Sequence, residues 1–144
     1  MKTAAHVLKA KSDHVVHTVG PTVSVIDAIK QMADKNIGAL LVVEYERVVG
    51  IVSERDFARK ILLVARSSRE TLVRDIMTSP VMYVRPEHSS EECMALMTKN
   101  RLRHLPVMDN GKLIGLISIG DLVKDIISDQ KFMIEQLEHY ISGA

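Results

Sequence analysis

Serine and aspartate stand three residues apart at two places, Ser53 and Asp56 in "GIVSERD" and Ser118 and Asp121 in "GLISIGD". An aliphatic run with a glycine precedes each serine, a pattern typical of a strand that ends where a helix begins. One interpretation is a capping box, in which the serine and the acid satisfy backbone N–H groups. Another is a nucleotide site, because a helix N-terminus favours phosphate and a carboxylate accepts hydrogen bonds from a ribose diol.

Other kinds of chemistry find less support in the sequence. His14 and His17 fall on a predicted strand and would point to opposite faces, and no zinc-ligand spacing occurs elsewhere. Cys93 lies in a helical pattern without a base partner, and no histidine accompanies either Ser-x-x-Asp motif as a triad would require. We therefore expect no metal site, no catalytic cofactor and no enzyme activity.

The composition also limits the partners. The 144 residues carry 19 basic and 18 acidic side chains, a net charge of +1, so we expect no nucleic-acid ligand. Aliphatic and methionine side chains must fill the core, because only 3% of residues are aromatic. The sequence contains no apolar run of membrane-spanning length and no secretory signal pattern. We expect a cytoplasmic protein without a membrane partner.

The sequence repeats itself at an offset of 65 residues. Between positions 19–56 and 84–121, nine of 38 aligned pairs are identical, including the glycine, serine and aspartate of both motifs. Such a repeat predicts two copies of one supersecondary unit. The recurrence of strand, glycine, serine and aspartate together favours the nucleotide interpretation over simple capping.

Each copy has the same predicted order of elements, β-α-β-β-α. The first strands are "HVVHTV" (14–19) and "PVMYV" (80–84), and the first helices begin after Ser24 and Ser89, which are good N-caps. Aliphatic hairpins follow, with turns at 45–46 and 110–111, and the second helix starts at each Ser-x-x-Asp. Short helices are expected in "AAHVLKAK" and "LVRDIM", and residues 65–71 form the connector. The predicted domains are the first repeat (1–65), the second repeat (66–128) and a helical extension (129–144).

These motifs carry a family resemblance. "GIVSERD", "GLISIGD", "VRDIMTSPVMYVRPEHS" and "RLRHLPVMDNGKLIGLISIGDL" resemble the signature of cystathionine-β-synthase (CBS) domains, and the likeness covers residues 5–128. The chain resembles a stand-alone tandem CBS pair, or Bateman module. The resemblance implies an α/β fold of two β-α-β-β-α repeats packed with pseudo-two-fold symmetry. It also implies a regulatory module that binds AMP, ADP, ATP or NAD, changes the packing of its repeats, and is read by another protein.

The resemblance also implies roles for individual residues. Asp56 and Asp121 would hold ribose, and Ser53 and Ser118 would contact phosphate or ribose. Adenine would lie among strand residues, with open space at Gly38 and Ala39, and basic side chains would reach the phosphates. The remaining implied positions are His17, Thr18, Arg55, Thr78, Met82, Tyr83, Arg101, Arg103, His104 and Pro106.

Residues 121–141 show helical periodicity beyond the repeats. Leu122, Ile126, Met133, Leu137 and Ile141 form an apolar stripe, with Val123, Ile127 and Ile134 beside it. Such a helix can fold back as one more surface helix, or it can contact a partner. We expect a homodimer, the usual outcome for CBS pairs. The alternative function is a structural protein-interaction module without a physiological nucleotide.

Overall fold

The computed structural model describes residues 2–11 and 14–142, which divide into two units. The first unit runs from Val15 to Met82 and contains the first Ser-x-x-Asp motif. The second unit combines the residues up to His14 with those from Tyr83 onward, and it contains the second motif. The units therefore divide the chain differently from the sequence repeats, because the first residues of the chain fold with the second repeat.

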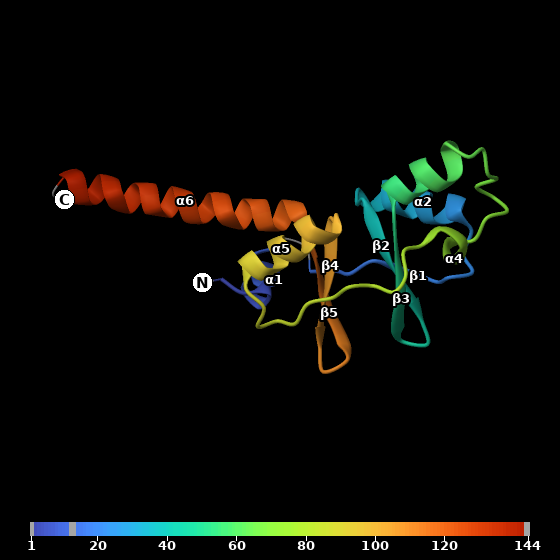
Figure 1. Cartoon of the computed structure of the whole chain (residues 1–144), viewed down its shortest axis with the longest axis horizontal. Helices are drawn as coiled ribbons and strands as arrows, with labels where there is room; N and C mark the ends of the chain where they lie inside the picture. The colour runs from blue at the N-terminus through green and yellow to red at the C-terminus, as the bar shows by residue number, and fades with distance from the viewer. Residues whose placement is uncertain (1, 12–13, 143–144) are drawn as a thin grey trace. The chain divides into compact units, whose positions relative to one another are not determined.

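A three-stranded sheet in the order β1-β2-β3 forms the centre of the first unit (Figure 1). β1 (Thr18–Val19) pairs in parallel with β2 (Ala39–Glu44), which forms an antiparallel hairpin with β3 (Arg47–Ser53). Tyr45 and Glu46 in the turn have φ values of 51° and 63°, the left-handed backbone that a two-residue hairpin turn needs. The predicted hairpin is confirmed.

The helices of the first unit lie before and after this hairpin. α2 begins after Ser24, as predicted, because the Ser24 hydroxyl accepts a hydrogen bond from the Asp27 N–H (3.3 Å). The helical segments are α2 (Val25–Lys35), α3 (Glu54–Phe57), the π-helical η1 (Ala58–Leu62) and α4 (Val73–Ile76).

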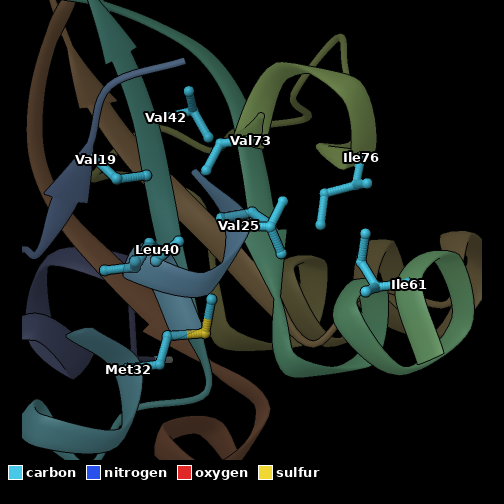
Figure 2. Packing of buried hydrophobic residues seen from close by; sticks show 10 residues of the cluster. Val19, Val25, Met32, Leu40, Val42, Ile61, Val73 and Ile76 are labelled. Carbon is cyan, nitrogen blue, oxygen red and sulfur yellow. The ribbon is translucent and has the colours of Figure 1, made fainter. Parts of the chain in front are cut away.

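The core of the first unit brings these helices onto the sheet. Figure 2 shows Leu40 of β2, Met32 of α2 and Ile61 of η1 in one cluster of buried aliphatic side chains. Val73 and Ile76 of α4 belong to the same cluster and are at most 1% exposed. The short helix that leads into the second repeat therefore completes the core of the first.

The described residues of the second unit form a two-stranded sheet and three helices (Figure 1). Its turn, Asn110–Gly111, has positive φ at both residues, as the sequence predicts. α5 begins after Ser89, as predicted, and a capping box joins Ser89 to Glu92. The elements are α1 (Ala4–Ala10), α5 (Ser90–Asn100), β4 (His104–Asp109), β5 (Lys112–Ser118) and α6 (Ile119–Ser142).

A short helix precedes each repeat, α1 before the first and α4 before the second, and we call these the lead-in helices. Each lead-in helix packs in the unit that contains the other repeat. Ala4 and Val7 of α1 are buried with Leu105 and Ile117 of the second hairpin, although α1 precedes the first repeat. Two isolated β-bridges follow the same crossed pattern. Thr3, just before α1, pairs with Ser89 of the second repeat, and Leu72, just before α4, pairs with Ser24 of the first. A helix of four to seven residues has little stability alone, so both depend on this packing.

The first predicted strand of each copy is shorter than expected. Of residues 14–19 only Thr18 and Val19 form a strand, and residues 80–84 contribute one parallel bridge, between Val84 and Val107. In the first copy the Leu41 N–H donates to the His17 carbonyl (3.4 Å). The aligned residue of the second copy is Pro106, which has no N–H to donate, so the ladder there stops at Val84.

Two further properties concern the described residues as a group. None of their helices combines the length and apolar character that crossing a bilayer requires. Their His, Cys, Asp and Glu side chains form no cluster of three or more suited to a metal ion.

Candidate functional site

The first Ser-x-x-Asp motif lies where β3 ends and α3 begins. The Asp56 carboxylate accepts hydrogen bonds from the Ser53 N–H (3.0 Å) and the Ser53 hydroxyl (3.1 Å), both at Oδ2. The Asp56 N–H donates to the Ser53 Oγ (3.2 Å), which completes a capping box. The Asp56 side chain is 16% exposed, so it is largely enclosed but still reachable from solvent.

A lysine that sequence reasoning missed also contacts this carboxylate. The Lys60 ammonium lies 3.3 Å from Asp56 Oδ1 and donates a 2.7 Å hydrogen bond to the Ile76 carbonyl at the end of α4. Lys60 stands four residues after Asp56, the spacing at which helical side chains meet. The sequence therefore contained a signal for this pair.

The second motif has a similar geometry at the junction of β5 and α6. The Ser118 N–H donates to Asp121 Oδ2 (2.8 Å), and the Asp121 N–H donates to the Ser118 Oγ (3.1 Å). The Asp121 side chain is 17% exposed. Both motifs thus place a carboxylate of similar exposure at a strand-to-helix junction, so the capping interpretation is confirmed for both.

The second carboxylate also has a lysine partner, which comes from a distant part of the chain. The Lys11 ammonium lies 2.9 Å from Asp121 Oδ2 and donates to the Leu116 carbonyl of β5 (2.7 Å). Burial, the largest influence, raises the pKa of Asp121, but the Ser118 N–H and the Lys11 ammonium outweigh it and lower the pKa overall. Lys11 follows α1 and is 110 positions from Asp121, so no local pattern could reveal this pair.

The two lysines have related roles although their positions do not align in the repeat. In the first unit Lys60 follows the motif along the chain and donates to a carbonyl of the lead-in helix α4. In the second unit the lysine follows the lead-in helix α1 and reaches a carbonyl of the motif strand. In both units an ammonium group therefore connects the lead-in segment to the motif aspartate.

The glycines before the motifs have a packing role. A Cβ at Gly50 would collide with the side chain of Met77, and a Cβ at Gly115 would lie 2.6 Å from Leu8 Cδ2. The group that approaches each glycine closely is thus a side chain of the lead-in segment.

The other predicted positions of the first copy lie at several places on the first unit. Gly38 and Ala39 are next to the motif, because the Glu54 N–H donates to the Gly38 carbonyl (3.0 Å) and Ala39 pairs with Ser53. His17 and Thr18 lie beside β2, whereas Thr78 pairs with Ile51 of β3 at the opposite edge of the sheet. Arg55 and Met82 are exposed.

In the second unit the predicted positions are similarly divided. His104 pairs with Ser118 across the hairpin, and the Arg103 carbonyl accepts a hydrogen bond from the Ile119 N–H (2.9 Å). Pro106 is buried within β4, whereas Tyr83 is 53% exposed. Arg101 is exposed and occupies the left-handed C-cap of α5 (φ 54°).

His104 is a poor candidate for a phosphate-binding cation. Burial lowers its pKa most, and the Lys11 and Arg103 charges lower it further, while Asp121 opposes the change. The imidazole is therefore neutral near pH 7. Arg103 lies next to the second motif in the backbone, and the Lys11 ammonium contacts Asp121 directly.

Comparisons with known proteins agree with this architecture. A model of the CBS domain matches residues 11–63 and 73–128. The mitochondrial CBS domain-containing protein CBSX3 of Arabidopsis thaliana is 42% identical over 125 residues, which are 83% of this chain and 61% of that protein. The chain thus spans about three fifths of this curated relative.

Solved structures extend the likeness to the fold. A protein with CBS domains from Burkholderia ambifaria MC40-6 is 60% identical with a TM-score of 0.86, and the match covers 90% of this chain and 96% of that one. The complex of CBSX2 with AMP is 27% identical with a TM-score of 0.74, covering 90% of this chain and 99% of that one. The protein described here therefore belongs to the CBS-domain family and carries two CBS domains in tandem.

Proposed function

We propose that this protein is a regulatory module that binds an adenine nucleotide, with Asp56 and Asp121 as the ribose-binding groups. The observation that carries the proposal is the pair of largely enclosed carboxylates, one at the strand-to-helix junction of each motif. A neighbour of the same fold, CBSX2, is known as a complex with AMP. The ligand class here is AMP, ADP, ATP or NAD.

The capping boxes do not prevent these carboxylates from binding a ligand. A carboxylate has about four acceptor positions on its two oxygens. In Asp121 both the backbone N–H and the Lys11 ammonium contact Oδ2. Asp121 therefore keeps about two acceptor positions for the hydroxyls of a ribose, whereas Asp56, which accepts twice at Oδ2 and contacts Lys60 at Oδ1, keeps about one. In both motifs the capping box holds the carboxylate in place before the ligand arrives.

Calorimetry with AMP, ADP, ATP and NAD tests the assignment. Asp56→Ala and Asp121→Ala should each weaken nucleotide binding at their own motif by roughly 10- to 100-fold, because a hydrogen bond to a charged group contributes about 1.5–3 kcal/mol. Asp75→Ala is the matched control, since Asp75 also accepts a capping hydrogen bond from a backbone N–H, that of Leu72 (3.1 Å). Unchanged affinity in both motif variants would reject the ribose assignment.

One observation supports the alternative of an interaction module without a nucleotide. Both motif carboxylates already have a capping box and a lysine partner, so neither needs a ligand to be satisfied. Mass spectrometry of the supernatant from denatured protein separates the two functions. Co-purified adenine nucleotide supports the sensor, whereas its absence together with no thermal stabilisation by any of the four nucleotides supports the interaction module.

The regulatory step follows from binding. A nucleotide shifts the equilibrium between two packing states of the repeats only as far as its affinity differs between them. Another protein would recognise the favoured state. X-ray scattering with and without a saturating nucleotide measures this step, and identical profiles would limit the module to binding alone.

The homodimer expected from the sequence is part of the same proposal. Its support is α6, whose exposed apolar side chains continue well past the second repeat. Light scattering at several protein concentrations gives the oligomeric state directly. A monomer at every concentration would contradict this part of the proposal without affecting the nucleotide assignment.

A further inference from the structure

We propose that α6 pairs with α6 of a second copy in antiparallel orientation, through one apolar stripe on the helix. This inference rests on the proposed homodimer and does not depend on the nucleotide. Among the described residues of α6, only Leu122 and Asp125 are buried, and the side chains of the later turns up to Ile141 are exposed. Figure 1 shows α6 extending past α1 and α5 of the same unit.

The apolar residues follow a heptad repeat. If Val123 is position a, then positions a, d and e recur through the end of the helix, which places them on one face. We call these nine residues the α6 stripe. It consists of Val123, Gln130 and Leu137 at a, Ile126, Met133 and Tyr140 at d, and Ile127, Ile134 and Ile141 at e.

The stripe offers enough surface for a stable dimer. Its eight apolar side chains are between 40% and 86% exposed. Fully covered, they would bury an area on the order of the roughly 800 Å² per partner that a standard protein interface buries. A contiguous exposed apolar patch of this size usually marks a binding site.

An antiparallel arrangement pairs every a and d residue of the stripe with one from the second copy. In this orientation position a of one helix meets position d of the other, and the two-fold axis falls between residues 131 and 132. Val123 then packs on Tyr140 of the second copy, Ile126 on Leu137 and Gln130 on Met133. Every layer from 123 to 140 has a partner, and smaller side chains meet larger ones at both ends.

The charges beside the stripe favour the same orientation. Position b flanks position e, and in an antiparallel pair the e sides of the two helices face each other. Lys124 then lies near Glu138 of the second copy, and the two-fold axis repeats this pair at the other end. Two Lys131 side chains meet at the axis and repel each other, and Glu135, one turn away on each helix, offsets this repulsion.

Disulfide trapping tests the orientation. Ile126→Cys and Leu137→Cys are made as separate variants, mixed in equal amounts and oxidised. The antiparallel pair predicts a covalent dimer in the mixture and little in either variant alone, because identical positions are about 16 Å apart along the axis. Unmodified protein is the control, since its one cysteine, Cys93, is buried. Crosslinking of each variant alone would indicate a parallel pair and overturn the proposal.

Two further sets of variants test the face and the charges. Leu137→Glu should shift the protein to monomer in light scattering, whereas Phe132→Glu should not, because Phe132 is 60% exposed but lies outside the stripe. Lys124→Glu and Glu138→Lys should each raise the dimer dissociation constant several-fold, and the double variant should restore it. Far-UV circular dichroism confirms that α6 stays helical. A dimer unaffected by Leu137→Glu, or equally weakened by Phe132→Glu, would overturn the proposal.

Discussion

The two motif aspartates show how one sequence pattern serves both stability and binding. The capping box explains why serine and aspartate occur three residues apart at a helix start. Capping alone does not explain why the carboxylates also contact Lys60 and Lys11 and stay partly accessible. Each aspartate is therefore held in place by its own helix and by the lead-in segment together.

His104 gives a testable consequence at the residue scale. Because its pKa is lowered in the folded state, the unfolded chain binds a proton more readily. Stability is then fully present above the unfolded pKa of about 6.5 and falls as the pH drops from there toward the folded pKa. Urea unfolding between pH 8 and pH 5 should show this loss in the wild type, and His104→Gln should reduce it.

His6→Gln, which replaces an exposed histidine on α1, is the control and should keep the wild-type pH profile. If the unfolding free energy fell equally steeply with pH in the wild type and in His104→Gln, the prediction would be wrong.

Asp121 contributes to stability in a separate pH range. Its lowered pKa contributes stability above about pH 3.9, the ordinary value for aspartate, and that stability is lost as the pH falls further.

At the scale of elements, the glycine in the last strand of each hairpin sets how closely the lead-in segment packs. Gly115→Ala would place a methyl group against the branched end of Leu8, and Gly50→Ala would place one against Met77. We expect Gly115→Ala to cost about 1–3 kcal/mol of unfolding free energy, the usual effect of overpacking. Gly50→Ala should cost less, because the unbranched methionine side chain adapts more easily.

A double-mutant cycle measures this contact by denaturant unfolding. The cost of Gly115→Ala should shrink when Leu8 is also replaced by alanine, because the added methyl group then has space. Gly111→Ala is a useful comparison. Gly111 has φ +77° with open space around it, so its cost comes from backbone strain and should not depend on Leu8. Strict additivity for Gly115 and Leu8 would contradict the packing role.

The elements also show which features the sequence could predict. Ser24, Ser89 and Asn110–Gly111 are local signals, so the helix starts and the second hairpin turn were predictable. The strand that ends and the helix that begins at each Ser-x-x-Asp motif were predictable for the same reason. The shortened first strand of the second copy was not, because the hydrogen bond lost at Pro106 matters only once the pairing of strands is known.

The site was predictable only in part. Lys60 could have been found from its spacing to Asp56, but Lys11 meets Asp121 only through the tertiary fold. The same reason hid the role of Gly115, whose neighbour Leu8 is 107 positions away. Local patterns fix elements, whereas the partners of a buried charge or a strand glycine depend on which segments pack together.

At the scale of the whole molecule, the crossed placement of the lead-in helices has a consequence that order along the chain would not suggest. Val7 of α1 is 2% exposed within the core of the second unit, and Val73 of α4 is fully buried within that of the first. Val7→Asp should therefore loosen β4 and β5, and Val73→Asp should loosen β2 and β3. The reason in both cases is an unpaired charge in an apolar core.

Hydrogen exchange followed by mass spectrometry resolves this pattern segment by segment. Val7→Asp should speed exchange in the second hairpin more than in the first, and Val73→Asp should do the reverse. His6→Asp and Arg74→Asp change exposed neighbours on the same two helices and should leave both hairpins protected. If Val7→Asp instead loosened residues 39–53 first, the lead-in helix would stabilise the repeat it precedes, and the crossed arrangement would be wrong.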